Sequence, residues 1–204
     1  MRPLPVYSMA KKWTNKNLPG ALHFVTGNVN KRLPFFRRDD ACLVFLEELQ
    51  NLKTKRECKI VAFVIMPDHI HLIANLRDGK VREWTGALKS LTARRLIEVA
   101  PPDCFRKNES ENQFWQESFK ALPLWSDWMI WQKINYIHSN PLKAKLADSA
   151  KDYRWSSFRS FYKMECEKFL QVDSDWWWED DVRKLSEAMA EWDEELKEKY
   201  KKLL

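Results

Sequence analysis

The chain has 204 residues, of which 45% are apolar, and this composition is typical of a folded globular protein rather than a disordered one. No apolar run approaches the length of a membrane span, and the basic, polar N-terminus lacks the apolar centre of a secretory signal, so we expect a cytoplasmic protein without membrane contact. Residues 1–162 hold 27 Lys and Arg against 16 Asp and Glu, whereas residues 163–204 hold 8 against 13, and the basic body favours a polyanionic partner, nucleic acid first.

The first part of the chain predicts a strand, a helix and a second strand. Residues 21–29 alternate well enough for a strand with side chains on two faces. Asp39 and Asp40 offer an N-cap for a helix over residues 41–55. Residues 58–66 then form a continuous apolar strand.

A pair of histidines follows this strand. Pro67 and Asp68 form a short turn, and His69 and His71 stand at the start of the next apolar run. Side chains at i and i+2 of a strand point to one face, so both imidazoles project together while Ile70 faces a core on the other side. Paired imidazoles are suited to a divalent metal ion. Two ordinary half-buried histidines are the alternative interpretation.

The later part of the chain predicts two more helices and another strand. Residues 81–99 form a helix with one apolar side, and the aromatic segment 113–121 is extended. A further helix is capped at residues 126–127 and runs to about residue 139, because Pro141 resists continuation of the helix.

The predicted order of elements is strand, helix, strand, strand, helix, strand, helix. This order indicates an α+β fold with a ferredoxin-like or RRM-like antiparallel sheet and helices packed on one face. We divide the chain into a basic N-terminal arm (1–20), a central domain (21–162) and an acidic helical extension (163–204). The extension predicts a helix from about Glu179 whose single apolar stripe packs on its own chain or, as the alternative, on a second copy.

A second group of candidate site residues lies in the segment N-Y-I-H-S-N-P. Tyr136 and Asn140 are four residues apart on a predicted helix and share one face. A phenol can attack a phosphodiester if the site neutralises the phosphate, and a metal held by His69 and His71 would do so. The Asn140 amide oxygen would then be a third metal ligand. A packed tyrosine and a capping asparagine at a helix end are the alternative interpretation.

Four blocks of the sequence, in order, carry a family resemblance. Residues 64–76 contain M-P-D-H-I-H-L, residues 121–145 contain Y-I-H-S-N-P-L-K-A, residues 152–158 begin D-Y-R-W-S-S, and residues 18–37 supply an opening strand and loop. Together they resemble the single-tyrosine HUH transposases of the IS200/IS605-like group, above all the REP-associated tyrosine transposases. Two features depart from the family pattern: the usual glycine after the tyrosine block is missing, and the acidic extension lies outside the resemblance.

The resemblance implies a role for each candidate residue. His69 and His71 would be metal ligands and Tyr136 the nucleophile, whereas Asn140 stands where the family has a glutamine. The implied enzyme is a metal-dependent single-stranded DNA endonuclease and strand transferase. It would form a 5′-phosphotyrosine intermediate with Mg²⁺ or Mn²⁺, in DNA transposition or in the processing of REP hairpins.

The expected partner is single-stranded or hairpin DNA, and the protein would be a monomer or homodimer. Five cations are candidates for phosphate contacts: Arg32, Arg37, Lys89, Arg94 and Arg95. Two other functions stay open at this point. One is a catalytically silent nucleic-acid-binding module that stacks bases on aromatic side chains, and the other is a metal-dependent hydrolase that uses water as its nucleophile.

Overall fold

The computed structural model describes residues 15–98, 113–168 and 171–190, together with residues 192, 194, 197 and 198. Most of the predicted N-terminal arm therefore lies outside the described residues. Within the described part of the chain, no helix is both long and apolar enough to cross a membrane.

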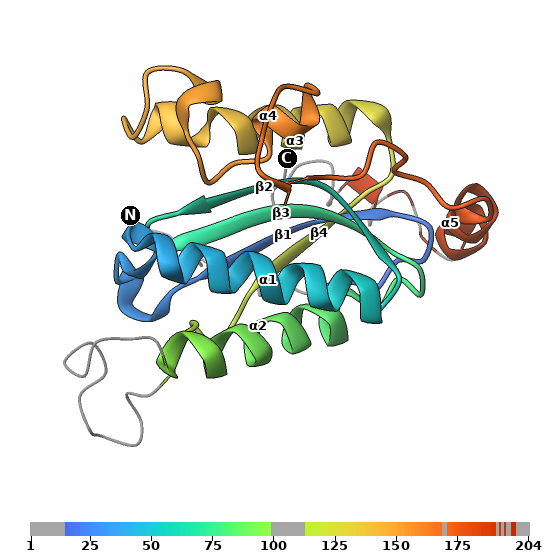
Figure 1. The fold of residues 1–204 in the computed structure, drawn as a ribbon. Helices are drawn as coiled ribbons and strands as arrows, with labels where there is room; N and C mark the ends of the chain where they lie inside the picture. Colours follow the sequence, from blue (N-terminus) through green and yellow to red (C-terminus); the bar gives the residue numbers. More distant parts are fainter. Residues whose placement is uncertain are drawn as a thin grey trace, which may run out of the picture.

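Four strands form one antiparallel sheet in the order β2-β3-β1-β4 (Figure 1). The strands are β1 (Leu22–Asn28), β2 (Cys58–Met66), β3 (His69–Leu76) and β4 (Lys120–Leu124). The main helices are α1 (Asp39–Lys55), α2 (Val81–Glu98) and α3 (Asp127–Lys143). The succession β1-α1-β2-β3-α2-β4 with this strand order is the ferredoxin-like arrangement, so the predicted fold class is confirmed.

Helices cover both faces of the sheet, although the sequence predicts them on one face. Helices α1 and α2 lie on one side and α3 lies on the other (Figure 1). Right-handed crossovers carry α1 and α2 to the same face. Strand β1 explains the third helix, because Val25 packs toward α1 and α2 whereas Phe24 joins the apolar cluster that contains Ile134 of α3. Both faces of the sheet are apolar and both need a cover.

The fourth strand begins later than predicted. The aromatic segment 113–121 is mostly irregular, and regular pairing starts only at Lys120. Phe114 and Trp115 are nevertheless buried in the core, and Trp115 forms a single bridge with Val29. Burial of aromatic side chains therefore accounts for the apolar signal of this segment without a strand.

Two helix ends also differ from the prediction. Helix α3 passes through Pro141 and ends at Lys143. A proline in the last turn removes one backbone hydrogen bond, which the packed helix tolerates. At the start of α1 the N-cap residue is Arg38, and Asp39 and Asp40 lie in the first turn, where carboxylates favour the helix dipole.

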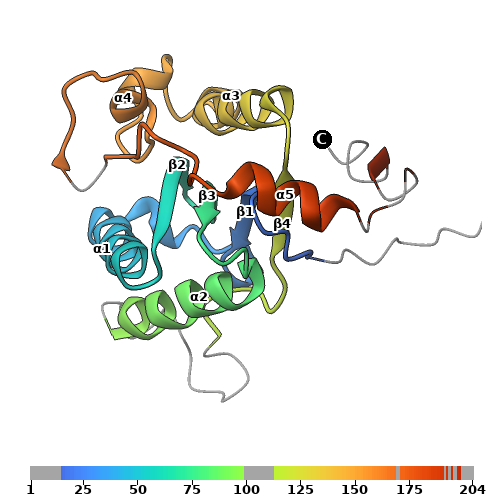
Figure 2. The same cartoon turned by 90° about the vertical axis from the view of Figure 1, so that its right-hand side faces the viewer.

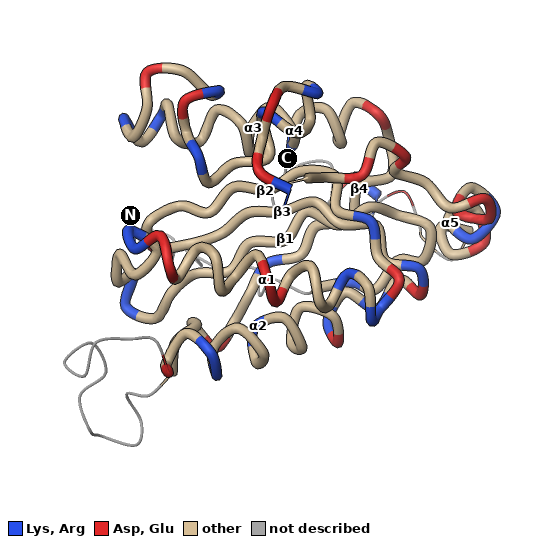
Figure 3. The backbone as a smooth tube through the Cα atoms, viewed as in Figure 1, with Lys and Arg blue, Asp and Glu red and all other residues tan. Residues whose placement is uncertain are grey.

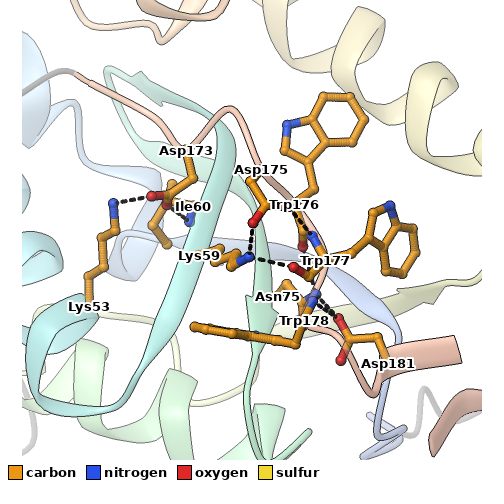
Figure 4. A network of polar contacts seen from close by, with 10 residues as sticks. All are labelled: Lys53, Lys59, Ile60, Asn75, Asp173, Asp175, Trp176, Trp177, Trp178 and Asp181. Atoms are coloured by element: carbon orange, nitrogen blue, oxygen red, sulfur yellow. Dashed lines mark hydrogen bonds and ion pairs between the residues drawn. The ribbon is translucent and has the colours of Figure 1, made fainter. Parts of the chain in front are cut away.

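The acidic extension packs on its own chain, as the apolar stripe predicts, through α5 (Asp181–Ala190) and the segment before it (Figure 2). Asp173 pairs with the edge of β2: its carboxylate accepts from the Ile60 N–H at 2.7 Å, and its own N–H donates to the Ile60 carbonyl at 2.8 Å (Figure 4). Gly20, with φ of 75°, admits α5, because a Cβ there would lie 2.2 Å from the Asp181 carbonyl oxygen. One residue of the predicted stripe, Val182, is instead 78% exposed.

We expect Asp181→Ala to destabilise the protein by about 2 kcal/mol, because the buried Asn75 amide would lose one of its two acceptors and the half-buried Trp178 N–H would lose its acceptor. The Asp181 carboxylate accepts from Asn75 Nδ2 and from the Trp178 N–H, each at 2.6 Å, and the side chain is fully buried (Figure 4). Urea unfolding measures the change. Glu187→Ala, which removes an exposed carboxylate of the same helix, is the control and should unfold at the wild-type midpoint. Equal midpoints for both variants would contradict the prediction.

Candidate active site

The two histidines lie at one end of the sheet on the face covered by α3. In β3, His69 pairs with Asn28 and His71 pairs with Thr26 of β1. Their ring centroids are 4.8 Å apart, and the His71 ring stacks on Phe24 at 5.3 Å. Ile70 packs into the cluster on the opposite face. The i and i+2 spacing therefore brings both imidazoles together as predicted.

Each imidazole uses one ring nitrogen in a fixed contact. His69 Nδ1 lies 2.6 Å from a carboxylate oxygen of Asp68, whose other oxygen accepts from Arg32 Nε at 2.8 Å. His71 Nδ1 lies 2.8 Å from the Thr26 hydroxyl oxygen. His71 Nε2 is buried and has no hydrogen-bond partner among the described residues. With Nδ1 as the donor, this nitrogen presents a lone pair, which suits a metal ligand.

Burial keeps both rings neutral. It lowers the pKa of His71 to about 3, and the neighbouring His69 ring and the cations Arg32 and Lys133 add to this effect. Burial also lowers the pKa of His69, although the hydrogen bond that His69 donates to Asp68 opposes the shift. A histidine must be neutral to ligate a metal, so both side chains have the required protonation state at neutral pH.

Helix α3 brings Tyr136 against the histidines. The Tyr136 ring centroid lies 5.2 Å from that of His71, and 38% of the residue is exposed. Two ammonium groups lie near the same ring, Lys143 Nζ at 5.3 Å and Lys133 Nζ at 5.7 Å from its centroid. Burial lowers the pKa of Lys133. A phenol is thus placed between a pair of neutral imidazoles and two cations.

Asn140 lies one turn beyond Tyr136 in the same helix and is half-buried, with its backbone carbonyl accepting from the Ala144 N–H. Among the described residues, no group of three or more His, Cys, Asp or Glu side chains is placed to hold a metal ion. The histidine pair therefore needs a further ligand of another type. An amide, phosphate or water oxygen meets that need.

The candidate DNA-binding cations do not converge on the site. Lys89 Nζ donates to the Gln116 carbonyl at 2.6 Å and to the Glu117 carbonyl at 2.9 Å, and burial lowers its pKa. Arg95 holds α2 to α1, with hydrogen bonds of 2.7 Å to Glu47 and Glu48. Both side chains support packing, and the whole of α2 lies across the sheet from the histidines. Arg94, a third cation of α2, is exposed and also lies across the sheet from the histidines.

Arg32 and Arg37 lie nearer the site. Arg32 binds Asp68 directly, and Arg37 is exposed in a short helix whose Phe36 N–H donates to the Pro67 carbonyl at 2.9 Å. Figure 3 shows that charge is otherwise spread over helices and loops, with acidic and basic residues side by side along α5.

Sequence reasoning did not find Thr26, Lys133 and Lys143. Thr26 becomes a partner of His71 only through the pairing of β1 with β3. The lysines were accessible to sequence reasoning, because positions three before and seven after Tyr136 share its helix face.

We expect Thr26→Val to weaken Mn²⁺ binding about tenfold or more, because the His71 Nδ1 contact orients the ring and fixes its tautomer. Isothermal titration of the protein with Mn²⁺ measures the affinity. Thr26→Ser keeps the hydroxyl and should bind as the wild type does. Unchanged affinity in the valine variant would show that Thr26 does not position the ring.

The sequence and the fold were compared with those of known proteins. The family described as IS200-like transposases matches residues 21–140, which is more than half of the chain and includes both histidines and Tyr136. The chain therefore belongs to the IS200-like transposase family, enzymes that cleave and rejoin DNA.

Two individual proteins refine this placement. A Haemophilus influenzae protein, assigned by its name to the REP-associated tyrosine transposases, is 29% identical over 158 residues, covering 72% of this chain and 84% of its own length. A solved structure of a REP-associated tyrosine transposase bound to a REP hairpin matches with a TM-score of 0.61, covering 80% of this chain and 92% of that chain. At 19% identity it shows that the fold is shared.

Proposed function

We propose that this transposase cleaves single-stranded DNA with Tyr136 as the nucleophile, beside a metal held by His69 and His71. One observation carries the proposal: the buried, unpartnered Nε2 belongs to the same His71 ring that contacts Tyr136. A lone pair on a neutral ring and a phenol at the same place are the parts that this chemistry needs. The family membership supports the assignment.

In the proposed reaction the Tyr136 oxygen forms a bond to the scissile phosphorus. The Tyr136 phenol gives up its proton, and the bond from phosphorus to the 3′ oxygen of the preceding nucleotide breaks. That oxygen takes up one proton and leaves as a 3′-hydroxyl, so the step is balanced without an added acid or base. The DNA end is held as a 5′-phosphotyrosine ester. Attack by another 3′-hydroxyl reverses the step and restores a phosphodiester, so no ATP is required.

The chain's own residues would supply binding and charge. Lys133 and Lys143 are placed to attract the phosphate toward Tyr136, since both ammonium groups lie within 6 Å of its ring. Asp68 and Thr26 hold the imidazoles in orientation. When bound, Mg²⁺ or Mn²⁺ would polarise the phosphate as a Lewis acid, and two nitrogen ligands favour Mn²⁺. We assign Asn140 as a third ligand.

We infer that the substrate is hairpin DNA with a single-stranded flank, because a protein of the same fold is bound to a REP hairpin. Arg32 and Arg37 would contact backbone phosphates. The chemistry would reside in residues 21–162. The acidic extension would support the sheet, since the carboxylates of Asp173 and Asp181 accept hydrogen bonds from β2 and β3, respectively.

A denaturing gel tests the proposal. The protein is incubated with labelled single-stranded hairpins from its own genomic neighbourhood in Mn²⁺, and a covalent protein–DNA species should migrate slowly. Cleavage without that species would favour the hydrolase that uses water. Binding of a verified target with neither cleavage nor an adduct would favour the silent binding module.

A further inference from the structure

A pocket opens on the outer side of α3, next to Tyr136. It has a volume of about 500 Å³ and lies between α3 and the segment that follows it. We call it the outer pocket and define it by six of its lining residues: Gln132, Tyr136, Ser139, Lys143, Phe158 and Tyr162. Tyr136 belongs both to this lining and to the contact with His71, so the pocket continues directly from the candidate active site.

The lining combines aromatic rings with positive charge. Phe158 and Tyr162 lie with ring centroids 4.6 Å apart, and 49% of Tyr162 is exposed. Lys133 and Lys143 also line the pocket, and its lining contains no acidic side chain from the described part of the chain. An aromatic face beside an ammonium group is the combination that binds a base and its phosphate in single-stranded nucleic acid.

Unpartnered polar atoms occur in the same lining. Gln132 Oε1 and His138 Nδ1 are buried and have no hydrogen-bond partner within the described part of the chain. His138 is 4% exposed and packs edge-on against Phe158, while its Nε2 lies 3.1 Å from the Ser157 hydroxyl. Both atoms are buried, so the exposed groups that the pocket offers to a ligand are the Tyr162 ring and the Lys143 ammonium group.

We propose that the outer pocket binds one unpaired nucleotide of the DNA strand that passes Tyr136, with its base against Tyr162 and its phosphate at Lys143. This inference rests on the proposed function, because it places the nucleotide next to the scissile phosphate. A base inside a duplex has both faces covered by its neighbours, so only an unpaired base can stack on a side chain. The pocket would thereby select single-stranded over double-stranded DNA beside the nucleophile.

Fluorescence anisotropy in EDTA tests the pocket separately from catalysis. The two probes are an oligothymidylate of about 15 nucleotides and an abasic chain of the same length and charge. The wild type should bind the thymidylate more tightly than the abasic chain. Tyr162→Ala should weaken thymidylate binding about fivefold or more and leave abasic binding unchanged, since it removes only the stacking face. Lys143→Gln should weaken the binding of both probes.

Matched variants control for surface and charge. Trp128→Ala removes an exposed aromatic side chain of α3 that is outside the pocket, as a control for Tyr162→Ala. Lys120→Gln removes a charge from β4, as a control for Lys143→Gln. Both should bind as the wild type does, and Tyr162→Phe should also retain binding. Equal affinity of Tyr162→Ala and the wild type for the thymidylate would overturn the proposal, as would equal losses in Tyr162→Ala and Trp128→Ala.

Photocrosslinking of the wild type needs no folded variant. An oligothymidylate carrying 5-iododeoxyuridine should crosslink to the peptide that contains Phe158 and Tyr162. Crosslinks confined to other peptides would overturn the proposal. This result also separates the two proposals: a crosslink here without any covalent adduct at Tyr136 in Mn²⁺ would keep the pocket and reject the nucleophile.

Discussion

A Tyr136→Phe variant should form no covalent adduct with single-stranded DNA and should lose cleavage by more than about 1,000-fold, because the substitution removes the attacking oxygen. The phenylalanine keeps the ring that packs against His71 and Phe24, so the fold and DNA binding should remain. Cleavage of an end-labelled hairpin in Mn²⁺ measures the loss, and binding of the same hairpin in EDTA verifies that the variant is folded.

Two other tyrosines serve as controls. The Tyr153 hydroxyl donates to the Ile65 carbonyl at 2.8 Å, and burial raises the pKa of this phenol, so it is a poor nucleophile. Tyr162 lines the outer pocket, where its ring packs against Phe158 and His138. Tyr153→Phe and Tyr162→Phe should therefore both form the adduct. If Tyr136→Phe cleaves as the wild type does, Tyr136 is not the nucleophile.

The second large effect concerns the histidines. His69→Ala should abolish cleavage while hairpin binding stays within about twofold, because Lys and Arg side chains, rather than the neutral imidazole, supply the charge that attracts the DNA phosphates. Titration with Mn²⁺ should show the parallel loss of metal binding. His71→Ala should behave in the same way, and His69 is the cleaner position because it is only half-buried and its removal leaves a smaller cavity.

Chelation provides the matching control for the histidine variants. EDTA should stop cleavage by the wild type, and added Mn²⁺ should restore it in the wild type but not in His69→Ala. Full cleavage by either histidine variant, or by the wild type in EDTA, would show that cleavage does not depend on a metal held by the histidines.

Local patterns predicted most of the elements and the centre of the site. The continuous apolar run of β2 and the paired histidines of β3 depend only on neighbours in sequence, and both were placed correctly. The same is true of Tyr136 and Asn140 on one helix. Periods of two and of three to four residues carry this information, because they reflect backbone geometry.

Contacts between distant segments could not be predicted in the same way. Thr26 is a partner of His71 only through strand pairing, and the hydrogen bonds of Lys89 and Arg95 also join segments that are far apart in the sequence. The position of α3 on the second face of the sheet also depends on long-range packing. A surplus of basic residues indicates a polyanion, but it does not say which cations are free to bind one.

The most direct test is to map the covalent adduct formed by the wild-type protein. After incubation with a single-stranded hairpin in Mn²⁺, nuclease and protease digestion leaves a nucleotide on one peptide, and mass spectrometry locates it. The nucleotide should be attached to Tyr136, on the peptide that also contains Asn140. A nucleotide attached to Tyr153, Tyr162 or any other residue would contradict the assignment of the active site.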